Sequence, residues 1–163
     1  MNLEEYQNEI IRTAEQLLDS KDKYEVVSFG IIGELGEVVD HLKKVFFHGH
    51  RLDELKLVEE IGDLLWYTCL GLYFQDKHEL KFENDTYISK RRCIKSRVLE
   101  FAERISRECF YHGYEEIYND IIELLPYVLI GVTIDDIMKC NIAKLERRYP
   151  NGFTTKDSIE RED

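Results

Sequence analysis

Apolar residues recur every three to four positions along most of the chain, a period that predicts helices. The clearest stripe consists of Ile31, Leu35, Val38, Leu42 and Val45. The same period predicts helices over residues 3–18, 24–46, 53–75, 90–110, 115–131 and 134–148. Residues 77–89 are expected to form a connecting loop, and 151–163 a polar tail. We therefore expect an all-α fold, a four-helix-bundle core with additional N- and C-terminal helices.

Two of the predicted helices carry a similar sequence. Segments 58–72 and 118–132 share Ile, Leu-Leu, Tyr and Gly at matching positions, and an aromatic-His-Gly turn precedes each of them. The alignment places one pair of acids over another, Glu60 and Asp63 over Asp120 and Glu123. We interpret residues 77–131 as an inserted or duplicated hairpin within a single domain, residues 1–163. The alternative is that two amphipathic hairpins share a turn type by chance.

Two pairs of acidic residues stand out because each pair is spaced by three positions. Glu34 and Glu37 lie in the second predicted helix, and Glu60 and Asp63 lie in the third. This spacing puts both carboxylates of a pair on one helix face, and antiparallel packing would bring all four together. Such a cluster is self-repelling, and a bound cation relieves the repulsion. Carboxylate oxygens are hard ligands that suit Mg²⁺, Mn²⁺ or Ca²⁺.

Glycines accompany the first acidic pair. Gly30, Gly33 and Gly36 each weaken a helix by about 1 kcal/mol relative to alanine. Their presence suggests that a backbone or a ligand approaches the helix closely at this point. Simple helix packing is the alternative explanation.

Net charge, cysteine spacing and the lengths of apolar segments indicate which binding partners and which cellular compartment to expect. The formal net charge of −11 argues against binding to nucleic acid or to an anionic membrane. The four cysteines show no CxxC spacing, which predicts buried, reduced thiols in a cytosolic protein. The first residues lack the basic segment followed by an apolar segment that marks an export signal. No apolar run approaches the length of a membrane span. A cytoplasmic location is therefore expected.

Glu60 and Asp63 lie within the segment Glu-Glu-Ile-Gly-Asp-Leu-Leu-Trp-Tyr, residues 59–67. Near the end of the last predicted helix the chain has Arg-Tyr-Pro at 148–150. Together these features resemble the MazG-like nucleoside triphosphate pyrophosphohydrolases, which belong to an all-α superfamily with the dimeric dUTPases. The resemblance covers about residues 24–75 and 133–155. Residues 77–131 are extra relative to the short family members.

The resemblance implies metal-dependent hydrolysis of an NTP or dNTP to the monophosphate and pyrophosphate, as in the removal of unwanted nucleotides from the pool. It implies Mg²⁺, with Mn²⁺ as a substitute, and a homodimer or a single-chain pseudo-dimer. The metal-binding and catalytic residues would be Glu34, Glu37, Glu60 and Asp63, with one glutamate as general base. The substrate-binding residues would be Asn141, Lys144, Arg148, Tyr67 and Trp66. Trp66 could instead be a packing residue. Arg148 could instead stabilise the C-terminus of its helix by offsetting the helix dipole.

Two other classes are compatible with helical periodicity alone. A di-iron carboxylate bundle needs E-x-x-H on two helices, and neither acidic motif has one. A non-catalytic helical interaction or regulatory module could have kept an acidic metal-binding cluster. The second hairpin lacks a matching E-x-x-E, so we expect one active metal site per chain.

Overall fold

The computed structural model describes residues 1–80 and 93–150, and these residues form helices and connecting segments. The helices are α1 (Leu3–Leu18), α2 (Lys23–His48), α3 (Glu54–Phe74), α4 (Ile94–Phe110), α5 (Tyr114–Val128) and α6 (Ile134–Arg148). The expected all-α class is confirmed, and each observed helix overlaps a predicted one. The predicted loop lies largely, and the predicted tail wholly, outside the described residues.

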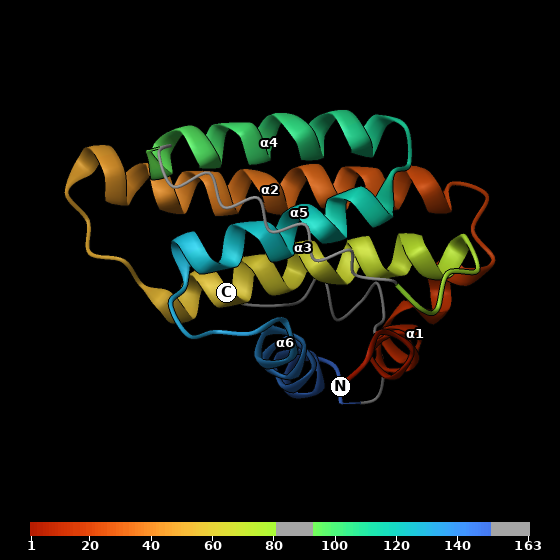
Figure 1. The fold of residues 1–163 in the computed structure, drawn as a ribbon. Helices are drawn as coiled ribbons and strands as arrows, with labels where there is room; N and C mark the ends of the chain where they lie inside the picture. Colours follow the sequence, from red (N-terminus) through yellow and green to blue (C-terminus); the bar gives the residue numbers. More distant parts are fainter. Residues whose placement is uncertain (81–92, 151–163) are drawn as a thin grey trace.

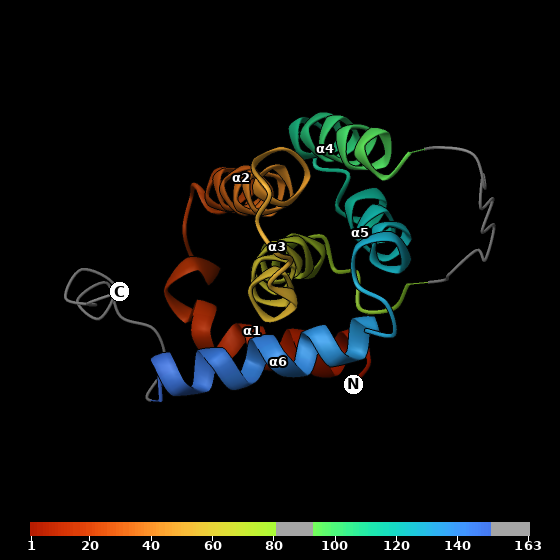
Figure 2. The same ribbon diagram turned by 90° about the vertical axis from the view of Figure 1, so that its left-hand side faces the viewer.

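The four central helices form a bundle of two antiparallel hairpins (Figure 1). Helices α2 and α3 make the first hairpin and α4 and α5 the second, with α2 against α4 and α3 against α5. Helices α1 and α6 lie side by side and run across the bundle, where both pack on α3 (Figure 2). The second hairpin thus packs against the first around one core, as the duplication hypothesis required.

Periodic apolar residues fill this core. On α2 the buried stripe is Ile31, Leu35, Val38 and Leu42. Its counterpart on α3 has buried residues at the same period, and α5 adds a third apolar face. Because α3 contacts α1, α2, α5 and α6, it is the most enclosed helix. Any polar residue at the edge of its apolar face is held in place by neighbours on several sides.

Local caps set the helix limits. Asp53 accepts a hydrogen bond from the Lys56 amide at 3.0 Å, and Thr133 caps α6, both as expected. Gly49 ends α2 in the left-handed conformation (φ 73°). In the second aromatic-His-Gly turn the left-handed residue is instead His112 (φ 57°). Its ring is held by a 3.0 Å hydrogen bond between Nδ1 and the Tyr114 hydroxyl.

Two predictions need correction at this level. Helix α5 runs through Pro126 and ends at Val128, not at 131, because Leu129 adopts an extended conformation (φ −135°, ψ 99°). All four cysteines are free, but only Cys69 and Cys109 are buried. Cys93 and Cys140 are exposed, since they lie before α4 and on the outer face of α6.

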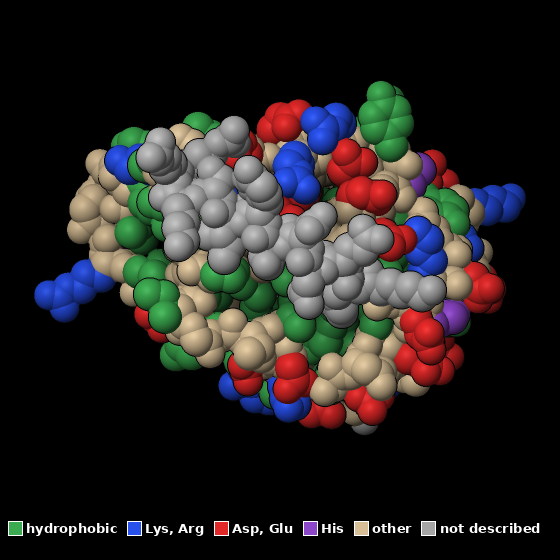
Figure 3. Space-filling view, viewed as in Figure 1, with side chains coloured by type: hydrophobic (Ala, Val, Ile, Leu, Met, Phe, Trp, Pro, Cys, Tyr) green, Lys and Arg blue, Asp and Glu red, His purple; other side chains and the backbone are tan. Residues whose placement is uncertain are grey.

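The surface agrees with the negative net charge. On the face seen in Figure 3, acidic side chains gather over the right-hand part, with Lys and Arg among them. No helix in the described ranges is both long and apolar enough to cross a membrane.

Candidate metal centre

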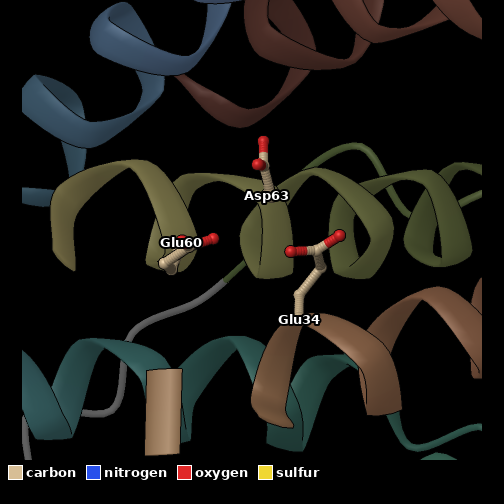
Figure 4. A group of neighbouring side chains, drawn as sticks. All are labelled: Glu34, Glu60 and Asp63. Carbon is tan, nitrogen blue, oxygen red and sulfur yellow. The ribbon is translucent and has the colours of Figure 1, made fainter. Parts of the chain in front are cut away.

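Three carboxylates meet where α2 packs on α3. Glu34 comes from α2 and reaches toward Glu60 and Asp63, which stand one turn apart on α3 (Figure 4). One oxygen from each of the three residues lies within 4.8 Å of the others. Glu60 is buried, and the other two side chains are partly exposed. This arrangement offers convergent oxygen ligands, which is the donor set that a divalent cation such as Mg²⁺ or Mn²⁺ uses.

Glu37, the fourth predicted ligand, is not part of this group. Its side chain is exposed one helical turn beyond Glu34. It lies near enough to Glu34 and Lys56 for its charge to raise the pKa of both groups, although in neither case is it the main cause. Glu37 therefore stands at the rim of the cluster, and its metal-binding role stays a prediction.

Two lysines compensate the clustered charge. The Lys56 ammonium lies 2.5 Å from Glu60 Oε1, and Lys144 forms an ion pair with Asp63 Oδ2. The hydrogen bond to Glu60 is the main reason that the pKa of Lys56 is raised. Lys56 was not among the predicted site residues, although its position four residues before Glu60 on one helix was a usable signal.

Asp63 is also held by an amide. Asn141 Nδ2 donates a 2.9 Å hydrogen bond to Asp63 Oδ1, while Lys144 binds the other carboxylate oxygen. Asn141 and Lys144 are 2% and 3% exposed. Both were predicted to contact substrate, but the structure places them behind Asp63 and not in the lining of the adjacent cavity. Their observed contacts make them residues that position Asp63.

Glu34 differs from the other two acids because no lysine pairs with it in the described part of the chain. Burial, followed by the charges of Asp63 and Glu60, raises the pKa of Glu34 to about 7. The carboxyl is therefore about half protonated near neutral pH, and a cation that binds there must displace a proton.

This shift predicts a pH-dependent metal affinity. A carboxyl with a raised folded-state pKa destabilises the protein as pH rises through that value, and a cation binds the ionised form. We expect the Mn²⁺ association constant to rise about tenfold between pH 6 and pH 8. Calorimetric titration at both pH values measures it. The Glu34→Gln variant should bind more weakly, with a flatter pH profile; an unchanged pH profile in that variant would assign the proton to another group.

A cavity of about 280 Å³ opens beside the carboxylates. This volume is near the lower limit for small-molecule sites, which begins at about 300 Å³. The cavity is lined by Thr13, Leu17, Val26, Glu34, Asp63, Trp66, Tyr67, Leu145, Arg148 and Tyr149. Three of the five predicted substrate-binding residues, Trp66, Tyr67 and Arg148, therefore lie in this lining. The contributions of α1, Thr13 and Leu17, carried no signal in the sequence.

Aromatic rings form one wall of the cavity. Trp66 and Tyr67 meet edge to face, with centroids 4.9 Å apart. Burial, followed by the charges of Glu34 and Asp63, raises the pKa of Tyr67. The Tyr67 hydroxyl is therefore kept in its neutral form beside the acids and remains available to donate a hydrogen bond.

Gly30 makes room for Tyr67. A Cβ at Gly30 would lie 2.3 Å from the Tyr67 ring, whereas Gly33 and Gly36 have open space around them. The close approach expected at the three glycines is thus found at Gly30 alone, and the approaching group is a side chain.

Alanine at these glycines should have opposite effects on stability. Gly30→Ala is expected to lower the free energy of unfolding by about 1–3 kcal/mol, because it displaces Tyr67. Gly33→Ala, one turn later on the same helix, should raise it by up to about 1 kcal/mol through helix propensity. Denaturant unfolding of both variants measures the difference. A Gly30→Ala variant as stable as Gly33→Ala would show that Tyr67 does not need this space.

An arginine lies against both acids of the second hairpin, Asp120 and Glu123. Arg104 on α4 pairs with Asp120, and its Nη1 lies 3.4 Å from Glu123 Oε2. The Asp120 side chain is 2% exposed. The cavity beside Asp120 measures about 30 Å³, whereas the cavity beside Glu34 and Asp63 measures about 280 Å³. A guanidinium therefore stands where the sequence alignment would place a cation. Among the described residues, the only group of three or more acidic, His or Cys ligands is the one at Glu34.

Comparison with protein-family models, with curated proteins and with solved structures finds no match to this chain.

Proposed function

We propose that this protein hydrolyses a nucleoside triphosphate, NTP or dNTP, to the nucleoside monophosphate and pyrophosphate, with a divalent metal as cofactor. The observation that carries the proposal is the carboxylate group of Glu34, Glu60 and Asp63, of which Glu34 and Asp63 line a cavity that also has aromatic walls. A nucleotide has the same two-part chemistry, an aromatic base and a polyanionic chain that needs a cation.

The residues fit Mg²⁺ by donor type and by charge. Three carboxylates supply hard oxygen ligands, and their mutual repulsion is relieved when a cation binds. Glu60 and Asp63 would hold the ion, and Glu37, exposed at the rim, stays a predicted ligand. Mn²⁺ would serve as a substitute, because it accepts the same ligands.

When bound, Mg²⁺ would supply charge neutralisation on the phosphates and orientation of the attacking water. We assign proton acceptance to Glu34, because it lines the cavity and no lysine in the described residues forms an ion pair with it, as Lys56 does with Glu60 and Lys144 with Asp63. Water attacks the α-phosphorus, the bond to the bridging oxygen breaks, and pyrophosphate leaves. Trp66, Tyr67 and Tyr149 would contact the base and sugar, and Arg148 a phosphate. All of these residues belong to one chain, and the homodimer or single-chain pseudo-dimer implied by the resemblance stays a prediction.

The test is a panel of NTPs and dNTPs incubated with Mg²⁺, with pyrophosphate and monophosphate as the detected products. We expect release of both from at least one nucleotide, and one Mn²⁺ per chain by calorimetry. Mn²⁺ binding without turnover of any nucleotide would favour a regulatory module that kept its metal site. Absence of Mn²⁺ binding would reject both functions.

A further inference from the structure

Two hydrogen bonds connect α1 to the metal centre through α6. The Tyr6 hydroxyl on α1 donates to Asn141 Oδ1 at 2.8 Å, and Asn141 Nδ2 donates to Asp63 Oδ1 at 2.9 Å. Tyr6 is 0% exposed, although it lies on a helix that carries none of the three carboxylates. Figure 2 shows α1 and α6 crossing together beneath α3. The hydrogen bond from Tyr6 to Asn141 joins these two helices.

The direction of these bonds is set by the chemistry of the three groups. Burial, followed by nearby charges that include Asp63, raises the pKa of Tyr6 well above its ordinary value, so the hydroxyl keeps its proton. A hydroxyl donor selects the carbonyl end of the Asn141 amide. The NH₂ end must then face Asp63, where a flipped amide would oppose one oxygen to another.

The residue before Asp63 is Gly62, which has no side chain to crowd the Asn141 amide. A Cβ at Gly62 would lie 3.1 Å from Asn141 Cβ and 3.3 Å from Nδ2. Glycine at this position lets α6 approach α3 closely enough for the amide to reach the neighbouring carboxylate. Asn141 is thus bound by the Tyr6 hydroxyl and packed closely against Gly62.

We propose that Tyr6 is a positioning residue of the metal centre, acting through Asn141 to hold the Asp63 carboxylate in its ligand orientation. With Oδ1 bound to Asn141 and Oδ2 bound to Lys144, both oxygens of the carboxylate are restrained, and one of them stays within 4.8 Å of ligand oxygens from Glu34 and Glu60. Partners that orient metal ligands typically change metal affinity by about 10–100-fold when they are removed. The inference rests on the proposed metal-dependent function, because it assumes that Asp63 is a ligand.

The experiment compares Tyr6→Phe with Tyr114→Phe by calorimetric titration with Mn²⁺. Tyr114 is a suitable control because it is equally buried and its hydroxyl bonds to His112, away from the three acids. We expect Tyr6→Phe to weaken Mn²⁺ binding about tenfold and Tyr114→Phe to leave it unchanged. Equal affinities for wild type and Tyr6→Phe would overturn the inference while the metal site stands. If the wild type binds no Mn²⁺, the proposed function and this inference fall together.

A double-mutant cycle separates positioning from a general loss of packing. In an Asn141→Ala background, Tyr6→Phe should have no further effect on Mn²⁺ affinity, because the intermediary is gone. The same tenfold loss in both backgrounds would refute action through Asn141. Gly62→Ala supplies an independent variant, since its Cβ displaces Asn141 and leaves Tyr6 intact; it should also weaken Mn²⁺ binding. Full Mn²⁺ affinity in folded Gly62→Ala would likewise count against the inference.

Discussion

Glu60→Gln is expected to lower nucleotide turnover by about a hundredfold to a thousandfold, the usual effect of removing one preorganised electrostatic group. Glu60 is the buried member of the group, so glutamine keeps its shape and removes only the charge that a cation needs. Mn²⁺ affinity should fall in parallel. The measurement is pyrophosphate release under saturating Mg²⁺, together with calorimetry.

Glu59→Gln is the matched control, because it is the same substitution one residue earlier on α3 and Glu59 lies outside the ligand group. It should retain turnover. Both variants should remain folded, since the Lys56 ammonium that loses its partner is half-exposed and can be hydrated. Full turnover by Glu60→Gln would reject the metal site, and equal loss in both variants would reject the assignment of Glu60.

The three acids are not interchangeable in such tests. Asp63→Ala would leave the Lys144 ammonium, whose side chain is 4% exposed, without its carboxylate. Leaving a buried charge without its partner destabilises a protein by about 3 kcal/mol or more. Loss of activity in that variant would therefore mix catalysis with folding, and glutamine at Glu60 is the cleaner substitution.

The helices could be predicted from the sequence because apolar periodicity and capping residues are local features of the chain. The stripe from Ile31 to Leu42 repeats at the helical period, and Asp53 and Thr133 are capping residues at the expected starts. The ends were less accurate where a local rule competed with the pattern. Helix α5 ends at Val128, where Leu129 turns extended, although apolar residues continue beyond it.

The candidate site was only partly predictable because its contacts join distant segments. Three acids could be placed on facing edges from spacing alone, but spacing could not show that Glu37 stays at the rim. Lys144 is 81 positions from Asp63, and no periodicity indicates that the two side chains meet. The resemblance implies that Asn141 and Lys144 contact substrate, which stays a prediction, but it did not indicate that both are buried and hydrogen-bonded to Asp63.

Arg104→Met is expected to destabilise the protein at pH 8.5 by about 1–2 kcal/mol, with a smaller effect at pH 5. Methionine keeps most of the apolar stem and removes the cation that neutralises buried Asp120. Burial raises the pKa of Asp120 to about 7, although Arg104 lowers it, and loss of Arg104 should raise it further. At pH 5 the folded protein can hold this carboxyl protonated, so little depends on the arginine. At pH 8.5 ionisation of the carboxyl leaves an uncompensated buried charge, and stability falls as pH rises.

Arg107→Met is the control for this prediction, because Arg107 lies on the same helix and pairs with exposed Glu103 at 2.9 Å. Its effect should stay within about 0.5 kcal/mol and should not change with pH. Adding Asp120→Asn to Arg104→Met should restore most of the stability at pH 8.5, since the buried charge is then absent. Urea unfolding at the two pH values measures all three variants. An equal loss for Arg104→Met at both pH values would show that Arg104 acts by packing, and the view that a guanidinium replaces the cation in the second hairpin would fail.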